Sequence, residues 1–193
     1  MRRSRLEMAK LPSELRSDAQ GGPLCHLTIF VVNEYNGVVA GKLQQEIHQT
    51  KAIRSPEEEA SLNIVRTADV LMLALSDVLK PHLLSATQYN VLRILRGAGD
   101  QGASCKDIGI RLVTRDPDIT RLMDRLEQRG LVTRDRAGQD RRVVTHRLSR
   151  AGLELVNELD GPIETLHRKT MGHMKAGKLR ELVKLLEEVR AGI

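Results

Sequence analysis

The chain has 193 residues, of which 40% are hydrophobic and 29% charged, a composition that indicates a globular protein and excludes a disordered one. Only 2% of the residues are aromatic, so the sequence lacks the stacking surfaces that bind single-stranded nucleic acid. The net charge is +6, and residues 111–150 supply +5 of it, with eleven Arg, no Lys and six acids (11 − 6 = 5). A charged stretch can simply be a solvated surface. Arginine, however, suits phosphates and guanine edges, so this one favours double-stranded DNA as a partner.

Cysteine usage and hydropathy exclude other classes of protein. Cys25 and Cys105 lie far apart, with no Cys or His at metal-ligand spacing, so we expect neither a disulfide framework nor a zinc site. His167 and His173 are six residues apart and do not share a helix face, so no metal site is predicted there either. No apolar run approaches the roughly 20 residues of a membrane-spanning helix. We expect a cytoplasmic protein without a metal or a cofactor.

The first 54 residues differ from the rest of the chain. They combine Gly21–Gly22–Pro23, a β-like run over 27–32 and a polar stretch over 44–51, without sustained helical periodicity. We expect residues 1–54 to be a leader, either a flexible arm or a mis-assigned upstream start. In the second case a GTG codon at Val38 or Val39 would be the true beginning.

Two helices are predicted next. Ser55 and Pro56, followed by three glutamates, form a strong helix start, and Pro81 stops this helix. Ser85 caps the second helix, 86–95, before Gly97 and Gly99. Both helices carry apolar residues at the spacing of one buried face: Leu62, Val65, Ala68, Met72, Leu75 and Leu79 in the first, and Tyr89, Leu92 and Leu95 in the second.

A helix-turn-helix and a hairpin follow. Ser104 caps a short helix over 105–113, and Asp116 caps a helix that starts with Pro117 and runs to Arg129, before Gly130. Residues 131–136 and 142–148 are rich in β-branched side chains and flank a turn, which predicts a hairpin. After Ser149 we expect a long helix over 152–174 and a final amphipathic helix over about 179–189. The fold class is therefore mainly α with a small β-hairpin wing (α+β), a winged helix-turn-helix.

The second helix of this motif has two different faces. Ile119, Leu122, Met123 and Leu126 form one apolar stripe, which leaves polar side chains on the other face. Because a recognition helix presents its N-terminal residues to base edges, Asp118, Thr120 and Arg121 are the predicted base-reading residues. Phosphate contacts, which set register but not sequence, are predicted for Arg115 and Arg125. An ordinary amphipathic surface helix is the alternative.

The hairpin tip, Gln139–Asp140–Arg141–Arg142, favours the DNA-binding interpretation. Two arginines on a short turn can reach into a narrow, electronegative minor groove. Asp140 can pair with Arg142 and hold that guanidinium in one rotamer.

Three segments of the chain resemble the MarR family (multiple antibiotic resistance regulators). They are LMDRLEQRGLV over 122–132, DRRVV over 140–144 and LSRAG over 148–152, in the order and at the spacing of that family. The resemblance covers roughly residues 56–193. Asp140 and Arg142 match the Asp-any-Arg pattern of its wing, whereas Ser149 stands where Thr is commoner.

The resemblance implies a homodimer on a pseudo-palindromic operator. Helices at about 56–80 and 150–190 would form the dimerisation base, and the winged helix-turn-helix would span about 85–148. A two-fold dimer would place its recognition helices roughly 34 Å apart, one turn of DNA. The family also suggests a phenolic or anionic effector between the base and the winged part. Candidate lining residues are Asp69, Met72, His82, Tyr89 and Arg93, with Arg93 or His82 as partner, although plain core and surface roles are at least as good an explanation.

Three functional classes compete. A ligand-responsive, sequence-specific repressor is favoured, and a non-specific architectural DNA-binding protein is the alternative. An enzyme is disfavoured because the sequence offers no nucleophile–base pair, glycine-rich phosphate loop or metal-ligand cluster. We expect Cys105 to be an inert core thiol rather than an oxidant sensor.

Overall fold

The computed structural model describes residues 41–135 and 144–193, and the chain divides into two compact units, 1–60 and 61–193. In the described part of the first unit, α1 (Leu43–Glu46) forms a single helical turn. The backbone N–H of Gly41 there donates to Glu59 Oε1 at 2.8 Å. No helix among the described residues is both long and apolar enough to cross a membrane.

The long helix α2 (Pro56–Leu79) begins and ends where the sequence predicts. Ser55 Oγ accepts the N–H of Glu58 at 3.2 Å, which caps its first turn. The predicted apolar stripe is present, but only Leu79 is fully buried. Val65 is 67% exposed and Met72 is 42% exposed. The stripe therefore has no covering partner within the described residues over most of its length.

Helix α3 (Ala86–Ala98) follows the short 3-10 turn η3 (Lys80–His82). Ser85 and Gln88 form a reciprocal capping box, with bonds of 3.1 and 3.0 Å. The predicted inward face of Tyr89, Leu92 and Leu95 is confirmed. The helix runs three residues longer than predicted, to Ala98.

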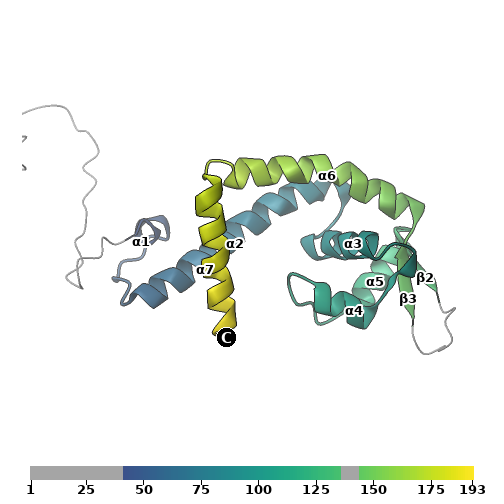
Figure 1. The fold of residues 1–193 in the computed structure, drawn as a ribbon, viewed down its shortest axis with the longest axis horizontal. Coiled ribbons are helices and arrows are strands. Elements are labelled where there is room, and N and C mark those ends of the chain that lie inside the picture. Colours follow the sequence, from purple (N-terminus) through teal and green to yellow (C-terminus); the bar gives the residue numbers. More distant parts are fainter. Residues whose placement is uncertain (1–40, 136–143) are drawn as a thin grey trace, which may run out of the picture. The chain divides into compact units, whose positions relative to one another are not determined.

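Helices α4 (Cys105–Arg111) and α5 (Ile119–Gln128) form the helix-turn-helix, close to α3 (Figure 1). Helix α4 ends two residues before the predicted Val113, whose N–H donates to Asn90 Oδ1 at 3.0 Å instead of a helical carbonyl. The prediction that Asp116 caps α5 was wrong, because Asp118 is the N-cap. Asp116 Oδ1 accepts the N–H of Asp118 at 2.8 Å in a local turn, so Pro117 precedes the helix.

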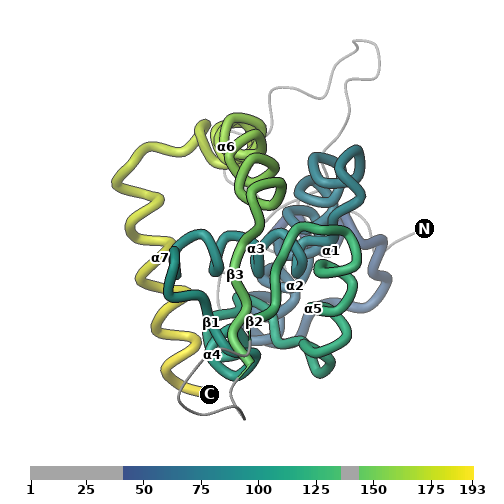
Figure 2. The backbone as a smooth tube through the Cα atoms, turned by 90° about the vertical axis from the view of Figure 1, so that its right-hand side faces the viewer, coloured from purple at the N-terminus to yellow at the C-terminus, as the bar shows by residue number. Residues whose placement is uncertain are grey.

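The predicted hairpin is confirmed at its base by β2 (Val132–Asp135) and β3 (Thr145–Leu148), which pair antiparallel. A two-residue strand that the sequence did not predict, β1 (Ala103–Ser104), pairs with the other edge of β3, giving the order β1-β3-β2 (Figure 2). Gly102, preceded by the turn η4 (Gly99–Gln101), approaches β3 closely with φ of 64°. The tip of the hairpin, with Gln139, Asp140, Arg141 and Arg142, lies outside the described residues.

Two helices close the chain, α6 (Arg150–Met171) and α7 (Ala176–Ala191). Ser149 Oγ accepts the N–H of Gly152 at 3.0 Å, which confirms the predicted cap of α6. Arg96 on α3 makes a forked contact with the Asp160 carboxylate on α6, at 2.8 and 3.0 Å, and holds the two helices together. No residue of α7 is buried. The architecture is the expected one, mainly helical with a small three-stranded wing sheet.

Candidate DNA-binding surface

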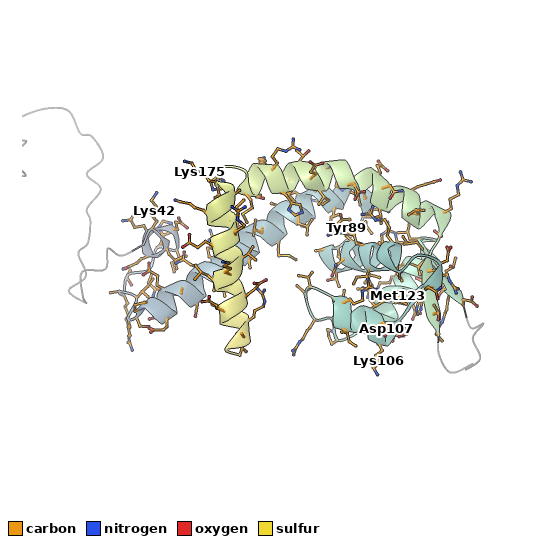
Figure 3. All side chains as sticks on the ribbon, in the orientation of Figure 1. Lys42, Tyr89, Lys106, Asp107, Met123 and Lys175 are labelled. Atoms are coloured by element: carbon orange, nitrogen blue, oxygen red, sulfur yellow. The ribbon has the colours of Figure 1, made fainter. Side chains whose placement is uncertain are left out.

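The surface begins with α5, which has one buried face and one polar face. Leu122, Met123 and Leu126 are 7%, 1% and 0% exposed and fix the helix on the core. Lys106 on α4 lies at the edge of the molecule (Figure 3). The opposite side of α5 carries exposed polar side chains, among them Thr120, Arg121 and Arg125.

The N-terminal end of α5 is built around the Asp118 carboxylate. Its Oδ1 accepts the N–H of Arg121 at 3.2 Å, and its Oδ2 lies 3.1 Å from Nε of the same arginine. The Arg121 side chain is nevertheless 78% exposed. Asp118 therefore acts inside the chain as a helix cap and a support that orients Arg121 outward. A direct contact between Asp118 and a base stays a prediction.

Two hollows flank α5 and separate the predicted contact residues into two groups. A hollow of about 170 Å³ lies between α5 and the start of α3, and its lining includes Asp118, Arg121 and Arg125. A larger hollow of about 380 Å³ lies between α5 and the wing sheet, and its lining includes Thr120 and Arg134. The structure thus places Arg121 and Arg125 on one flank of the helix and Thr120 on the wing side. Arg115 is exposed in the loop before α5.

Two arginines anchor the wing sheet. Arg147 on β3 donates from Nη1 to Asp135 on β2 at 2.6 Å and from Nε to the carbonyl of Asp100 at 2.6 Å. Arg134 on β2 pairs with Asp124 on α5 at 3.7 Å, linking the sheet to the recognition helix. The strands that lead to the tip are therefore fixed on both sides.

The hollow beside the wing also contains His146 and Cys105. His146 is only 3% exposed, and its Nδ1 has no hydrogen-bond partner among the residues that the structure describes. Burial, followed by the nearby Arg134 charge, lowers the pKa of His146, which favours the neutral imidazole. Burial raises the pKa of the Cys105 thiol, so it stays protonated near neutral pH. The expectation of an unreactive thiol agrees with that environment.

Of the candidate effector residues, two lie together. Tyr89 is 5% exposed, on the side of α3 toward α6 (Figure 3), and the Arg93 guanidinium lies 5.9 Å from its ring centroid. Asp69 pairs instead with Arg66 on α2 at 3.7 Å, and Met72 is 42% exposed. His82 belongs to η3, at the end of α2.

Sequence reasoning missed Arg134, Arg147 and the start of α3 as parts of this surface. The two arginines were counted in the charge of 111–150, but their partners come from distant elements. The capping residues Ser85 and Gln88 were visible as a helix start, and their position beside α5 depends on tertiary packing.

Comparisons with known proteins agree with this geometry. The MarR family model matches residues 84–144, which include α3, α4, α5, β1 and β2. The homoprotocatechuate degradative operon repressor of Escherichia coli is 27% identical over 131 residues, which are 68% of this chain and 87% of that protein.

Solved structures of similar fold cover most of the chain. The crystal structure of a MarR transcription factor from Planctomyces limnophilus is 41% identical, with a TM-score of 0.55, over 70% of this chain and 98% of that one. Bordetella bronchiseptica BpsR, described with regulation of its DNA binding by 6-hydroxynicotinic acid, is 22% identical with a TM-score of 0.63. That match covers 72% of this chain and 98% of BpsR.

Proposed function

Because the chain belongs to the MarR family of DNA-binding transcriptional regulators, which are not enzymes, we propose that it is a homodimeric repressor that binds a pseudo-palindromic operator. The observation that carries this proposal is the pairing of an exposed, arginine-bearing recognition helix with apolar helices that have no covering partner among the described residues. As a cytoplasmic protein it would meet chromosomal DNA directly.

The DNA-binding part of the proposal assigns a role to each flank of α5. Thr120 and Arg121 would read base edges in the major groove, with Asp118 holding Arg121. Arg115 and Arg125 would contact phosphates on either side of the helix. At the wing tip, Arg142 would enter the minor groove, supported by Asp140 and accompanied by Arg141.

The dimer rests on exposed apolar surface. On α2, Val65 and Leu73 are 67% and 61% exposed, and on α7 Val183 and Leu185 are 54% and 53% exposed. Helices with apolar stripes are expected to bury them, and a second copy of the chain is the simplest cover. We therefore assign α2 and the two last helices, about 56–80 and 150–190, to the dimerisation base, and 85–148 to the winged part.

A small aromatic acid would serve as the effector. Tyr89 offers a ring and a hydroxyl, and Arg93 beside it offers a cation for a carboxylate or phenolate. BpsR, whose DNA binding responds to a hydroxylated aromatic acid, has the same fold. A thermal-shift series with 6-hydroxynicotinic acid and simple phenolic acids would test this, because a ligand at 100 times its Kd stabilises the folded state by about 2.7 kcal/mol. Absence of any shift, or an equal shift in Arg93→Ala, would count against the site.

The DNA-binding roles are tested on duplexes that the full chain selects from a random pool. Arg142→Ala should weaken binding and lower the slope of log affinity against log salt by about one. Arg121→Ala should instead relax base preference at particular positions. Arg54→Ala, which removes an exposed arginine outside both the dimerisation base and the winged part, is the control and should change neither.

The same selection separates the repressor from an architectural DNA-binding protein. A sequence-specific regulator enriches a motif with two-fold symmetry and binds it far more tightly than scrambled DNA. Equal affinity for both duplexes would favour the architectural alternative. Sedimentation of the free protein, measured alongside, tests the dimer.

A further inference from the structure

Two helices of this protein end in the same kind of turn, and one side chain connects them. Helix α2 with η3 ends at Leu83, where the N–H of Leu83 donates to the Lys80 carbonyl at 3.0 Å and the N–H of Leu84 to the Leu79 carbonyl at 3.3 Å. This is a Schellman motif, and Leu79 and Leu84, the two positions of its usual apolar contact, are both buried in the same core cluster.

Helix α5 ends in the same way at Gly130. The N–H of Gly130 donates to the Glu127 carbonyl at 2.8 Å, and the N–H of Leu131 to the Leu126 carbonyl at 3.0 Å. Leu126 and Leu131 are both buried. Both turns are therefore anchored in the core, and the residue between α5 and its turn is Arg129, the C-cap.

The Arg129 side chain reaches across to the other turn. Its Nη1 donates to the carbonyl of Leu83 at 2.6 Å, and its Nη2 donates to the carbonyl of His82 at 2.9 Å. These two carbonyls are not used by the Schellman bonds, and carbonyls at a helix C-terminus attract a cation. A planar guanidinium offers two donor nitrogens in a fixed plane, which suits two adjacent acceptors, whereas the donors of an ammonium group all share one nitrogen.

We infer that Arg129 is a positioning residue that fixes the recognition helix to the end of α2 and thereby sets the spacing between half-sites that the dimer accepts. The inference rests on the proposed dimer, in which α2 belongs to the base and α5 to the winged part. The loop 80–85 is one of two covalent links between these parts, and Arg129 makes it a fixed joint. When the two hydrogen bonds of Arg129 are lost, α5 can change its orientation relative to the base. The affinities for operators with different half-site spacings then become more similar.

The experiment compares Arg129→Met, which keeps an apolar stem, with Arg129→Lys and with a control, Arg54→Met, in the full chain. Arg54 is exposed and lies outside both the base and the winged part. The affinity of each protein is measured for the selected operator, for versions with one or two base pairs added between the half-sites, and for a single half-site. The wild-type protein should prefer its own spacing strongly, since each added pair rotates one half-site by about a tenth of a turn. Arg129→Met should reduce that preference by roughly three- to tenfold, and Arg129→Lys should reduce it by less. The expected effect is moderate because the contact made by Arg129 is exposed to solvent. Single-half-site affinity should stay unchanged.

Three outcomes overturn the inference. Unchanged spacing preference in Arg129→Met excludes the joint, and an equal loss on every duplex, including the half-site, makes Arg129 a DNA contact instead. Hydrogen exchange of the free protein provides the third test and does not depend on dimerisation. The amides of Leu84 and Leu131 should exchange faster in Arg129→Met than in the control. If the wild type sediments as a monomer and shows no spacing preference, the dimer proposal fails. Faster exchange of the Leu84 and Leu131 amides in Arg129→Met would then still support a fixed joint between the two turns. Equal exchange in Arg129→Met and the control would contradict it.

Discussion

The left-handed residue in the α2 turn can be tested by replacing Leu83 with glycine. Leu83 has φ of 54° and ψ of 36°, the conformation in which a Schellman motif usually places glycine. Its side chain is 78% exposed, so removing it sacrifices little burial in the single chain. The substitution should therefore act through the backbone.

The expected gain follows from two opposing terms. A residue with a Cβ in the left-handed region costs about 1–2 kcal/mol. Glycine avoids this cost but loses about 0.5–1 kcal/mol through its greater freedom in the unfolded chain. Leu83→Gly should therefore raise the free energy of unfolding by about 0.5–1 kcal/mol, which corresponds to a Tm increase of about 1–4 °C in a protein of this size.

The assay is thermal and urea unfolding of wild type, Leu83→Gly and the control Leu83→Ala, each at the same two protein concentrations. Alanine removes the same side chain but keeps the Cβ, so it should bring no gain. A glycine variant no more stable than the alanine variant would refute the backbone argument. A loss of stability in both variants, growing on dilution, would show instead that the Leu83 side chain packs against a second copy.

Three further predictions concern the wing and α6. Because burial lowers the pKa of His146, the folded protein should lose stability as pH falls through about 6.5. Urea unfolding between pH 7.5 and 5 should show that the free energy of unfolding depends less on pH in His146→Leu than in the wild type. An equal pH dependence in both proteins would contradict this. A Cβ on Gly152 would collide with the backbone just before β2, so Gly152→Ala should lower the stability of the fold by about 1–3 kcal/mol. Gly161 lies in open space on the same helix, so Gly161→Ala should raise the stability by up to about 1 kcal/mol. A double-mutant cycle of Arg147→Met and Asp135→Asn should give a coupling of about 0.5–1 kcal/mol in urea unfolding, since both side chains are partly exposed, and additivity would argue that the pair contributes nothing.

Local patterns predicted most of the winged part because capping and periodicity are local effects. Ser55, Ser85, Ser104 and Ser149 each begin a helix as predicted, and the apolar spacing in α5 identified its buried face. The cap of α5 was misplaced because two aspartates two residues apart can both act as caps, and only the turn made by Asp116 selects the later one.

Contacts between distant segments could not be predicted in this way. Strand β1 has two residues, too few to show any alternation, and it exists because β3 offers it a free edge. The stripe on α2 was correctly identified as apolar, but its spacing does not say whether the chain itself or a second copy covers it. The partners of Arg129 and Arg147 include backbone carbonyls, which carry no mark in the sequence.

The chemistry of the Arg129 joint also determines how the protein can vary. Since Arg129 binds main-chain oxygens, every amino acid at positions 82 and 83 presents the same acceptors, and side-chain changes there leave the joint intact as long as the turn forms. Position 129 has no such freedom, because only arginine offers two charged donor nitrogens in one plane. We expect orthologues to differ freely at 82, to prefer residues that tolerate a left-handed backbone at 83, and to keep arginine at 129 wherever operator spacing is kept. The acceptor side of the joint, at positions 82 and 83, is thus insensitive to side-chain mutation. The donor side, at position 129, can be lost through a single substitution.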